Sequence, residues 1–160
     1  MNNKTFIKNL KVLSTWKLVG LSIITLNIYY AHYIRNQTFI INDNINNSDN
    51  ISETFATAFL VFSYTTVILG FINILIQSTI MDNIASLLNL LIVIMLITWG
   101  FKARNRLNKY CNFDKSNKYW FHGLWTFFLT PFYFNYKVNS IYNDTHNKLL
   151  EEERVSPAST

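Results

Sequence analysis

The sequence predicts an all-α integral membrane protein: a central two-helix transmembrane hairpin flanked by two shorter, aromatic-rich helical segments that are membrane-inserted or re-entrant. Half of the 160 residues are hydrophobic and only 14% are charged, against roughly one quarter in soluble domains. No Lys, Arg, Asp or Glu occurs from Thr54 to Met81 or from Asn83 to Phe101. Uncharged stretches of about 20 residues have the length that a hydrocarbon core requires.

The first segment, 18–34, begins as an apolar run and ends rich in tyrosine. With the basic residues before it, this run resembles a signal peptide, but no small-residue cleavage site follows, so we expect the segment to be retained. Tyr and Trp rings favour the boundary between headgroups and hydrocarbon. We therefore expect 18–34 to enter the membrane and return. The Asn-rich stretch 36–52 predicts a solvated loop.

Residues 55–76 and 84–101 are the two predicted spans. As helices they would be about 33 Å and about 27 Å long at 1.5 Å per residue, enough to cross a bilayer. The polar stretch from Gln77 to Asn83 between them is so short that the two helices must be antiparallel neighbours.

Small and polar side chains recur at spacings of three and four along both spans. In lipid, helices associate through small residues and interhelical hydrogen bonds, because apolar burial gives little drive there. We therefore predict that Asn73 and Gln77 face Ser86 and Asn89. The whole predicted helix-packing seam is Thr66, Gly70, Asn73, Gln77, Ser86 and Asn89. The alternative interpretation is a polar path for an ion or solute.

Basic residues and then aromatic residues follow the second span. Four of the cations are predicted to contact anionic lipid headgroups: Lys102, Arg104, Arg106 and Lys109. The aromatic-rich segment 119–134 is predicted to be interfacial or re-entrant, and Pro131 should end or kink a helix near Thr130. We expect a single membrane domain over 1–142 and a polar, disordered tail over 143–160.

Counting cations over the loops predicts the topology, because Lys and Arg stay on the cytoplasmic side. If all four apolar segments cross, seven of the 14 Lys and Arg lie on each side. If only 55–76 and 84–101 cross, all 14 are cytoplasmic. We therefore predict a multi-pass protein of the cell inner membrane with both termini cytoplasmic. A three-span alternative, in which the first segment also crosses, gives ten inside and four outside.

The stretch Thr25-Leu26-Asn27-Ile28-Tyr29 resembles the Thr-Leu-Gly-Ile-Tyr pattern of the bacterial domain of unknown function 4234 family, whose members are small integral membrane proteins. The stretches TWGFKARNRLN and FYFNYKVNS extend this resemblance over about residues 16–142. Thr25, Asn27 and Tyr29 are the motif residues, and Asn27 replaces the glycine of the pattern. Asn is the next-best residue for a left-handed turn. The resemblance implies a bacterial membrane location and an architecture, and it implies no reaction.

The pieces IITLNIYYAHYIRN and FFLTPFYFNYKVNS echo each other: each places Thr before a turn-prone residue, then aromatic residues, a basic residue and Asn. Chance in an aromatic-rich chain and an internal duplication both explain this echo.

The sequence carries no Ser/His/Asp order, no metal-ligand spacing and no phosphate-binding loop, and Cys111 is its only cysteine. We predict no enzymatic activity, no cofactor and no nucleic-acid binding. His32 and His122 could in principle ligate haem, but bonds to water or backbone are the simpler interpretation. The predicted function is protein-protein association in the membrane, with lipids and a second copy or another membrane protein as partners. An oligomeric transport or channel component is the alternative.

Overall fold

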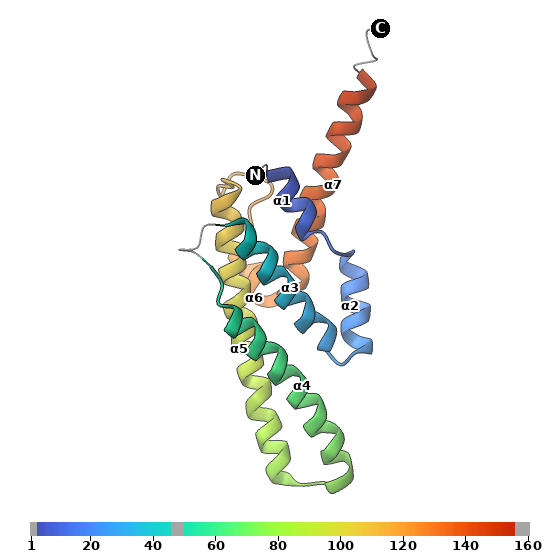
Figure 1. Cartoon of the computed structure of the whole chain (residues 1–160), viewed down its shortest axis with the longest axis vertical. Coiled ribbons are helices and arrows are strands. Elements are labelled where there is room, and N and C mark those ends of the chain that lie inside the picture. The colour runs from blue at the N-terminus through green and yellow to red at the C-terminus, as the bar shows by residue number, and fades with distance from the viewer. Residues whose placement is uncertain (1–2, 46–49, 156–160) are drawn as a thin grey trace.

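The computed structural model describes residues 3–45 and 50–155, and within these ranges every regular element is a helix (Figure 1). The predicted all-helical fold is therefore confirmed for the described residues, and so are its two long apolar helices. The elements are α1 (Asn3–Leu10), α2 (Thr15–Ile24), α3 (Ile28–Asn44), α4 (Glu53–Ile76), α5 (Thr79–Tyr110), α6 (Gly123–Leu129) and α7 (Phe132–Val155).

The helices α4 and α5 form the predicted antiparallel hairpin. Ser52 caps the start of α4, because its side chain accepts a hydrogen bond from the backbone N–H of Phe55 at 3.2 Å. Gln77 ends α4 in the left-handed conformation, with φ at 50°. The helix α5 is longer than the predicted span and continues through the basic residues to Tyr110.

The segment 18–34 is two helices, α2 and α3, joined by a tight turn. Leu26 and Asn27 are both left-handed, with φ at 50° and 70°, and Asn accepts this conformation better than most residues. The chain therefore reverses at the position where the sequence predicted a bend. The solvated loop predicted over 36–52 is wrong for residues 36–44, because α3 continues to Asn44 and buries Gln37, Thr38 and Ile41.

The segment 119–134 is also a helical reversal, made by α6 and the start of α7. The helix α6 ends at Leu129 and Pro131 precedes α7, so the predicted break near Thr130 is confirmed. The disordered tail predicted from residue 143 is wrong for 143–155, because α7 is helical to Val155. Residues 156–160 of that predicted tail lie outside the described residues. The two pieces of the sequence echo thus cover the two turns, α2–α3 and α6–α7.

The core lies around the second half of α5. Trp99, Ala103 and Leu107 on α5 are fully buried there, against α3 and α7 among other elements. Beyond Ser63 on α4, and before Ile92 on α5, neither helix buries a residue. We call this part the distal hairpin, residues 64–91. Figure 1 shows it projecting beyond the other helices.

Candidate functional site

Asn73, predicted to lie in a seam between the spans, instead closes the turn at the tip of the distal hairpin. Its side-chain N–H donates to Asp82, and its side-chain oxygen accepts from the backbone N–H of Ser78 at 2.8 Å. Gln77 itself is the left-handed residue that ends α4, and its side chain is exposed. These residues therefore define the hairpin turn.

The predicted facing of Asn73 and Gln77 with Ser86 and Asn89 is wrong. Ser86 and Asn89 are exposed, whereas Ala85, Leu88 and Ile92 are the more buried positions on this part of α5. Gly70 is also no point of close approach, since an added Cβ would meet no atom within 4 Å. Thr66, the remaining seam residue, donates to the carbonyl of Ser63 in its own helix. Apolar side chains therefore fill the α4–α5 contact.

The motif Thr25, Asn27 and Tyr29 forms the α2–α3 turn. The Thr25 hydroxyl donates to the Leu21 carbonyl at 2.7 Å and accepts from the backbone N–H of Tyr29 at 2.9 Å. The hydroxyl thus satisfies the N–H of Tyr29 in the first turn of α3, which a helix start otherwise leaves unpaired, and it adds a second bond to the Leu21 carbonyl, which also accepts from the backbone N–H of Thr25. Thr25 and Asn27 therefore stabilise the turn of the chain between α2 and α3, and this local role explains their place in the sequence pattern.

Two of the four predicted headgroup cations are tied to backbone carbonyls. The Arg104 guanidinium donates to the Phe121 carbonyl at 2.8 Å, and Arg106 donates to the Asn50 carbonyl at 3.0 Å. Lys102 lies 5.5 Å from the centre of the Phe55 ring, and Lys109 is exposed. Arg104 and Arg106 therefore hold neighbouring segments against α5, a role that the sequence did not suggest.

A buried polar network joins the two helical reversals, and the sequence analysis missed it. Asn135 on α7 is fully buried; it accepts from the Tyr33 hydroxyl at 3.1 Å and donates to the Leu13 carbonyl and the Thr15 hydroxyl, each at 3.2 Å. The Trp99 indole on α5 makes a second buried bond, which it donates to the Thr38 hydroxyl on α3 at 2.9 Å. The asparagine-after-aromatics feature of the echo is the only sequence signal that pointed to Asn135.

Of the two histidines considered as haem ligands, His32 has a protein partner for its ring, and His122 is held through its backbone groups. The His32 ring nitrogen lies 2.9 Å from the Tyr64 hydroxyl, and their rings meet edge to face. The backbone N–H of His122 donates to the Tyr133 hydroxyl at 3.0 Å, while its carbonyl accepts from Thr126. In the described part of the chain, no three His, Cys, Asp or Glu side chains gather where they could hold a metal ion.

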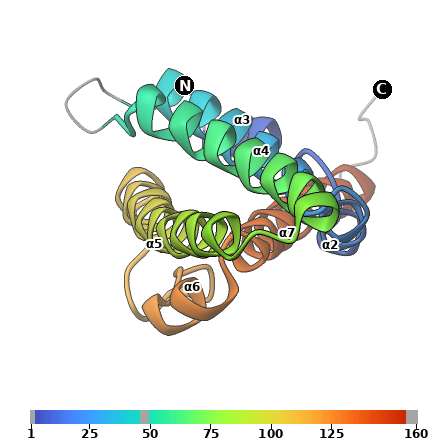
Figure 2. The ribbon, with the colours of Figure 1, turned by 90° about the horizontal axis from the view of Figure 1, so that it is seen from below.

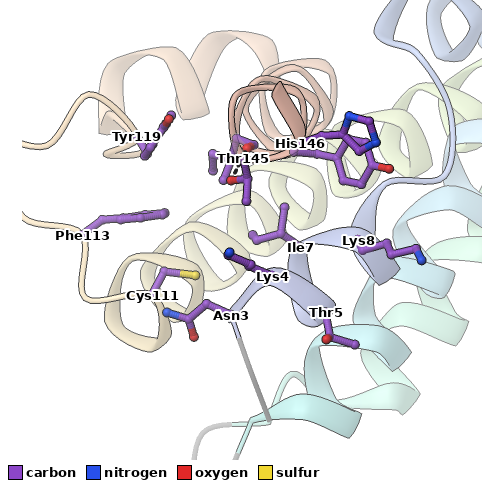
Figure 3. Close-up of a pocket in the computed structure, with 12 residues that line it drawn as sticks. Asn3, Lys4, Thr5, Ile7, Lys8, Cys111, Phe113, Tyr119, Thr145 and His146 are labelled. Carbon is purple, nitrogen blue, oxygen red and sulfur yellow. Dashed lines mark hydrogen bonds between the residues drawn. The ribbon is translucent and has the colours of Figure 1, made fainter. Parts of the chain in front are cut away.

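A cavity of about 550 Å³ opens at the end of the molecule away from the hairpin tip, between α1, α7 and the segment that follows α5 (Figure 3). Its lining combines amines, aromatic rings and a thiol, including Lys4, Lys8, Cys111, Tyr119, Tyr142 and His146. None of its lining residues is Asp or Glu. Such a lining suits an apolar molecule that carries a negative charge, but it holds no carboxylate to act with His146 in acid-base catalysis.

An ion pair fixes the segment that borders this cavity. The Lys118 amine lies 2.7 Å from the Asp144 carboxylate on α7, which also accepts from the Tyr119 hydroxyl at 3.1 Å. The bond from Lys118, and then the bond from Tyr119, lower the pKa of Asp144, and the same pair raises the pKa of Lys118. The pair keeps the connection between α5 and α6 against α7.

The Cys111 thiol is expected to be unreactive, and its titration should lower stability at alkaline pH. Burial raises its pKa from 9.0 to about 12, so the folded state binds this proton more tightly than the unfolded chain does. This contribution to stability is complete below pH 9 and is lost as the pH rises towards 12. The apparent melting temperature should therefore fall less steeply over this range in Cys111→Ser. Equal slopes for the two proteins would contradict the assignment.

Comparisons of the chain with protein-family models, with curated proteins and with solved structures give no match. The family resemblance carried by Thr25, Asn27 and Tyr29 therefore stays a prediction.

Proposed function

We propose that this chain is a small integral membrane protein that acts by associating with a second copy of itself through the α4–α5 hairpin. The observation that carries the proposal is the exposed, unpartnered amide of Asn89 in the middle of a helix surface that is otherwise apolar apart from Ser86.

The exposure of the hairpin supports lipid as its surroundings. Only 11% of the most apolar 18-residue window of α4, and 17% of that of α5, is buried within the chain. The core helix of a soluble protein would be mostly buried, and a signal sequence would lie near the N-terminus. Exposed side chains such as Ile74, Leu75 and Leu87, each at least 60% exposed, form a larger apolar surface than water-soluble monomers present.

The distribution of charge supports one orientation. The distal hairpin contains no Lys or Arg and a single acidic residue, Asp82. All 14 Lys and Arg lie elsewhere in the chain. Because cations are retained on the cytoplasmic side, the hairpin tip would face outward and both termini would face the cytoplasm of a bacterial cell. We place the protein in the inner membrane on this basis.

Asn89 then supports association. It lies ten residues along α5 from Thr79, which is about 15 Å from the tip and near the middle of a hydrocarbon core about 30 Å thick. Among the described residues, no group bonds to its exposed amide. An unpaired amide in hydrocarbon costs several kcal/mol. A second hairpin would supply the partner, because two Asn89 side chains can donate to and accept from each other across a two-fold axis.

Replacing Asn89 with leucine should weaken self-association. Interhelical hydrogen bonds of this kind contribute about 1–2 kcal/mol in model membranes, so we expect the dissociation constant to rise roughly tenfold, measured by energy transfer between labelled copies in lipid vesicles. The matched control is Asn83→Leu, at the tip, where water can replace a partner. Equal affinity of Asn89→Leu and the wild type would contradict the proposal. A ring larger than a dimer, with Asn89 facing its axis, would favour the transport alternative.

A further inference from the structure

We propose that the protein is a membrane wedge that favours curved bilayers. The end of the molecule opposite the hairpin tip, which carries the Lys and Arg residues and which we call the basic face, lies on the convex side. This inference rests on the proposed transmembrane hairpin. It adds an activity, the stabilisation or sensing of positive curvature in the leaflet that holds α2, α3, α6 and the start of α7.

The cross-section of the molecule changes along the hairpin. The distal hairpin contains only α4 and α5, whereas at the other end α2, α3, α6 and α7 join them (Figures 1 and 2). Contacts fix where this change occurs: His32 on α3 lies beside Tyr64 on α4, and Thr130, before α7, lies against Gly100 on α5. A helix is about 10 Å wide and occupies roughly 80 Å². Four additional helices therefore widen one leaflet by roughly 300 Å².

Both helical reversals end in exposed apolar tips. At the α2–α3 turn, Ile23 and Ile24 are 71% and 79% exposed. On α6, Phe128 and Leu129, beside the α6–α7 turn, are 68% and 45% exposed. No other element of the described chain covers these side chains. Acyl chains are the expected surroundings of the α2–α3 tip, because His32 lies beside Tyr64, 12 residues or about 18 Å along α4 from Ile76. The α6–α7 turn lies at the boundary between acyl chains and headgroups, because Thr130 lies against Gly100, 21 residues or about 31 Å along α5 from Thr79.

Neither reversal is long enough to reach the opposite leaflet. The helix α2 has 10 residues and α6 has seven, which correspond to about 15 Å and about 10 Å of the roughly 30 Å hydrocarbon core. Each also starts beside a cation that holds its first turn near the headgroups. Lys17 lies in the first turn of α2, and the Arg104 guanidinium lies within 3.2 Å of a Cβ built on Gly123, the first residue of α6.

Insertion limited to one leaflet expands that leaflet more than the other. Amphipathic segments buried only to the headgroup and upper acyl region are sensitive to curvature for this reason. The hairpin fixes the orientation of the wedge, because its tip carries no cation. A membrane that is convex on the basic face therefore accommodates the shape, and a membrane of the opposite curvature opposes it.

The test compares the two orientations of the full chain in one membrane. Two variants on a Cys111→Ser background, Asn143→Cys at the basic face and Asn83→Cys at the hairpin tip, are reconstituted separately into giant vesicles of phosphatidylcholine and phosphatidylglycerol. A membrane-impermeant maleimide dye then marks only the molecules whose cysteine faces outward. A narrow tube is pulled from each vesicle, and the ratio of dye density in the tube to that in the vesicle is measured.

We expect Asn143→Cys molecules to be enriched in the tube by roughly twofold or more, and Asn83→Cys molecules to be depleted, as a curvature-sensitive segment requires. Adding Ile23→Ser and Ile24→Ser should bring both ratios towards one. The matched control, Val12→Ser with Leu150→Ser, changes two exposed apolar residues away from the tips and should leave the ratios unchanged. Equal ratios for the two orientations would overturn the wedge and leave the hairpin proposal intact. Failure of both cysteines to label, or loss of the protein from washed vesicles, would overturn both proposals.

Discussion

Trp99→Ala should lower the free energy of unfolding by about 3–5 kcal/mol, the usual cost of removing a buried aromatic side chain. Trp99 is fully buried, its indole donates to the Thr38 hydroxyl at 2.9 Å, and its ring meets that of Phe134 with centroids 5.2 Å apart. One side chain thus joins α3, α5 and α7, so its removal leaves a cavity where three helices meet. Chemical unfolding in detergent, followed by circular dichroism, measures the change.

Trp16→Ala is the matched control, because Trp16 is 85% exposed and the same atoms are removed. We expect this variant to stay within about 0.5 kcal/mol of the wild type, as exposed positions usually do. Similar losses for Trp99→Ala and Trp16→Ala would show that the packing around α5 is not as described.

Asn135→Leu should cost about 2–4 kcal/mol, the second-largest effect. The substitution leaves the buried Tyr33 hydroxyl and the Thr15 hydroxyl without this partner, and an unsatisfied buried polar group costs about 1–3 kcal/mol. The Leu13 carbonyl keeps one donor, because Asn139 also bonds to it at 3.0 Å. The same unfolding experiment measures the loss.

Asn143→Leu is the control on the same helix, since Asn143 is exposed and should change stability little. A companion variant, Tyr33→Phe, should recover part of the loss in an Asn135→Leu background, because it removes the orphaned hydroxyl. Additive effects of the two substitutions would contradict a direct bond between these side chains.

The parts of the fold that depend on local pattern could be predicted from the sequence. Uncharged windows of helical length predicted α4 and α5, and their short connection predicted the hairpin. Asn27 predicted a left-handed turn and Pro131 predicted a helix end or kink near Thr130, because their effects on the backbone are local. The helical content of 36–44 was missed because Asn-rich composition obscured the buried positions Gln37 and Ile41.

The interactions between distant segments could not be predicted in this way. Nothing near Asn135 in the sequence indicates that its partners are Tyr33 and Leu13, more than 100 residues away. The seam prediction failed for a related reason. Spacing places Ser86 and Asn89 on a common side of α5, but it does not say whether that side meets α4, and apolar residues occupy that contact.

The most direct test of the account is the membrane topology of the full chain in a bacterial host. On a Cys111→Ser background, Asn83→Cys and Asn143→Cys are treated separately with an impermeant maleimide, before and after the inner membrane is opened. We predict that Asn83→Cys labels in intact spheroplasts, that Asn143→Cys labels only after lysis, and that both proteins stay with the membrane through an alkaline wash. Labelling of both positions from one face, or a chain that remains dissolved without detergent, would contradict a hairpin that crosses the bilayer.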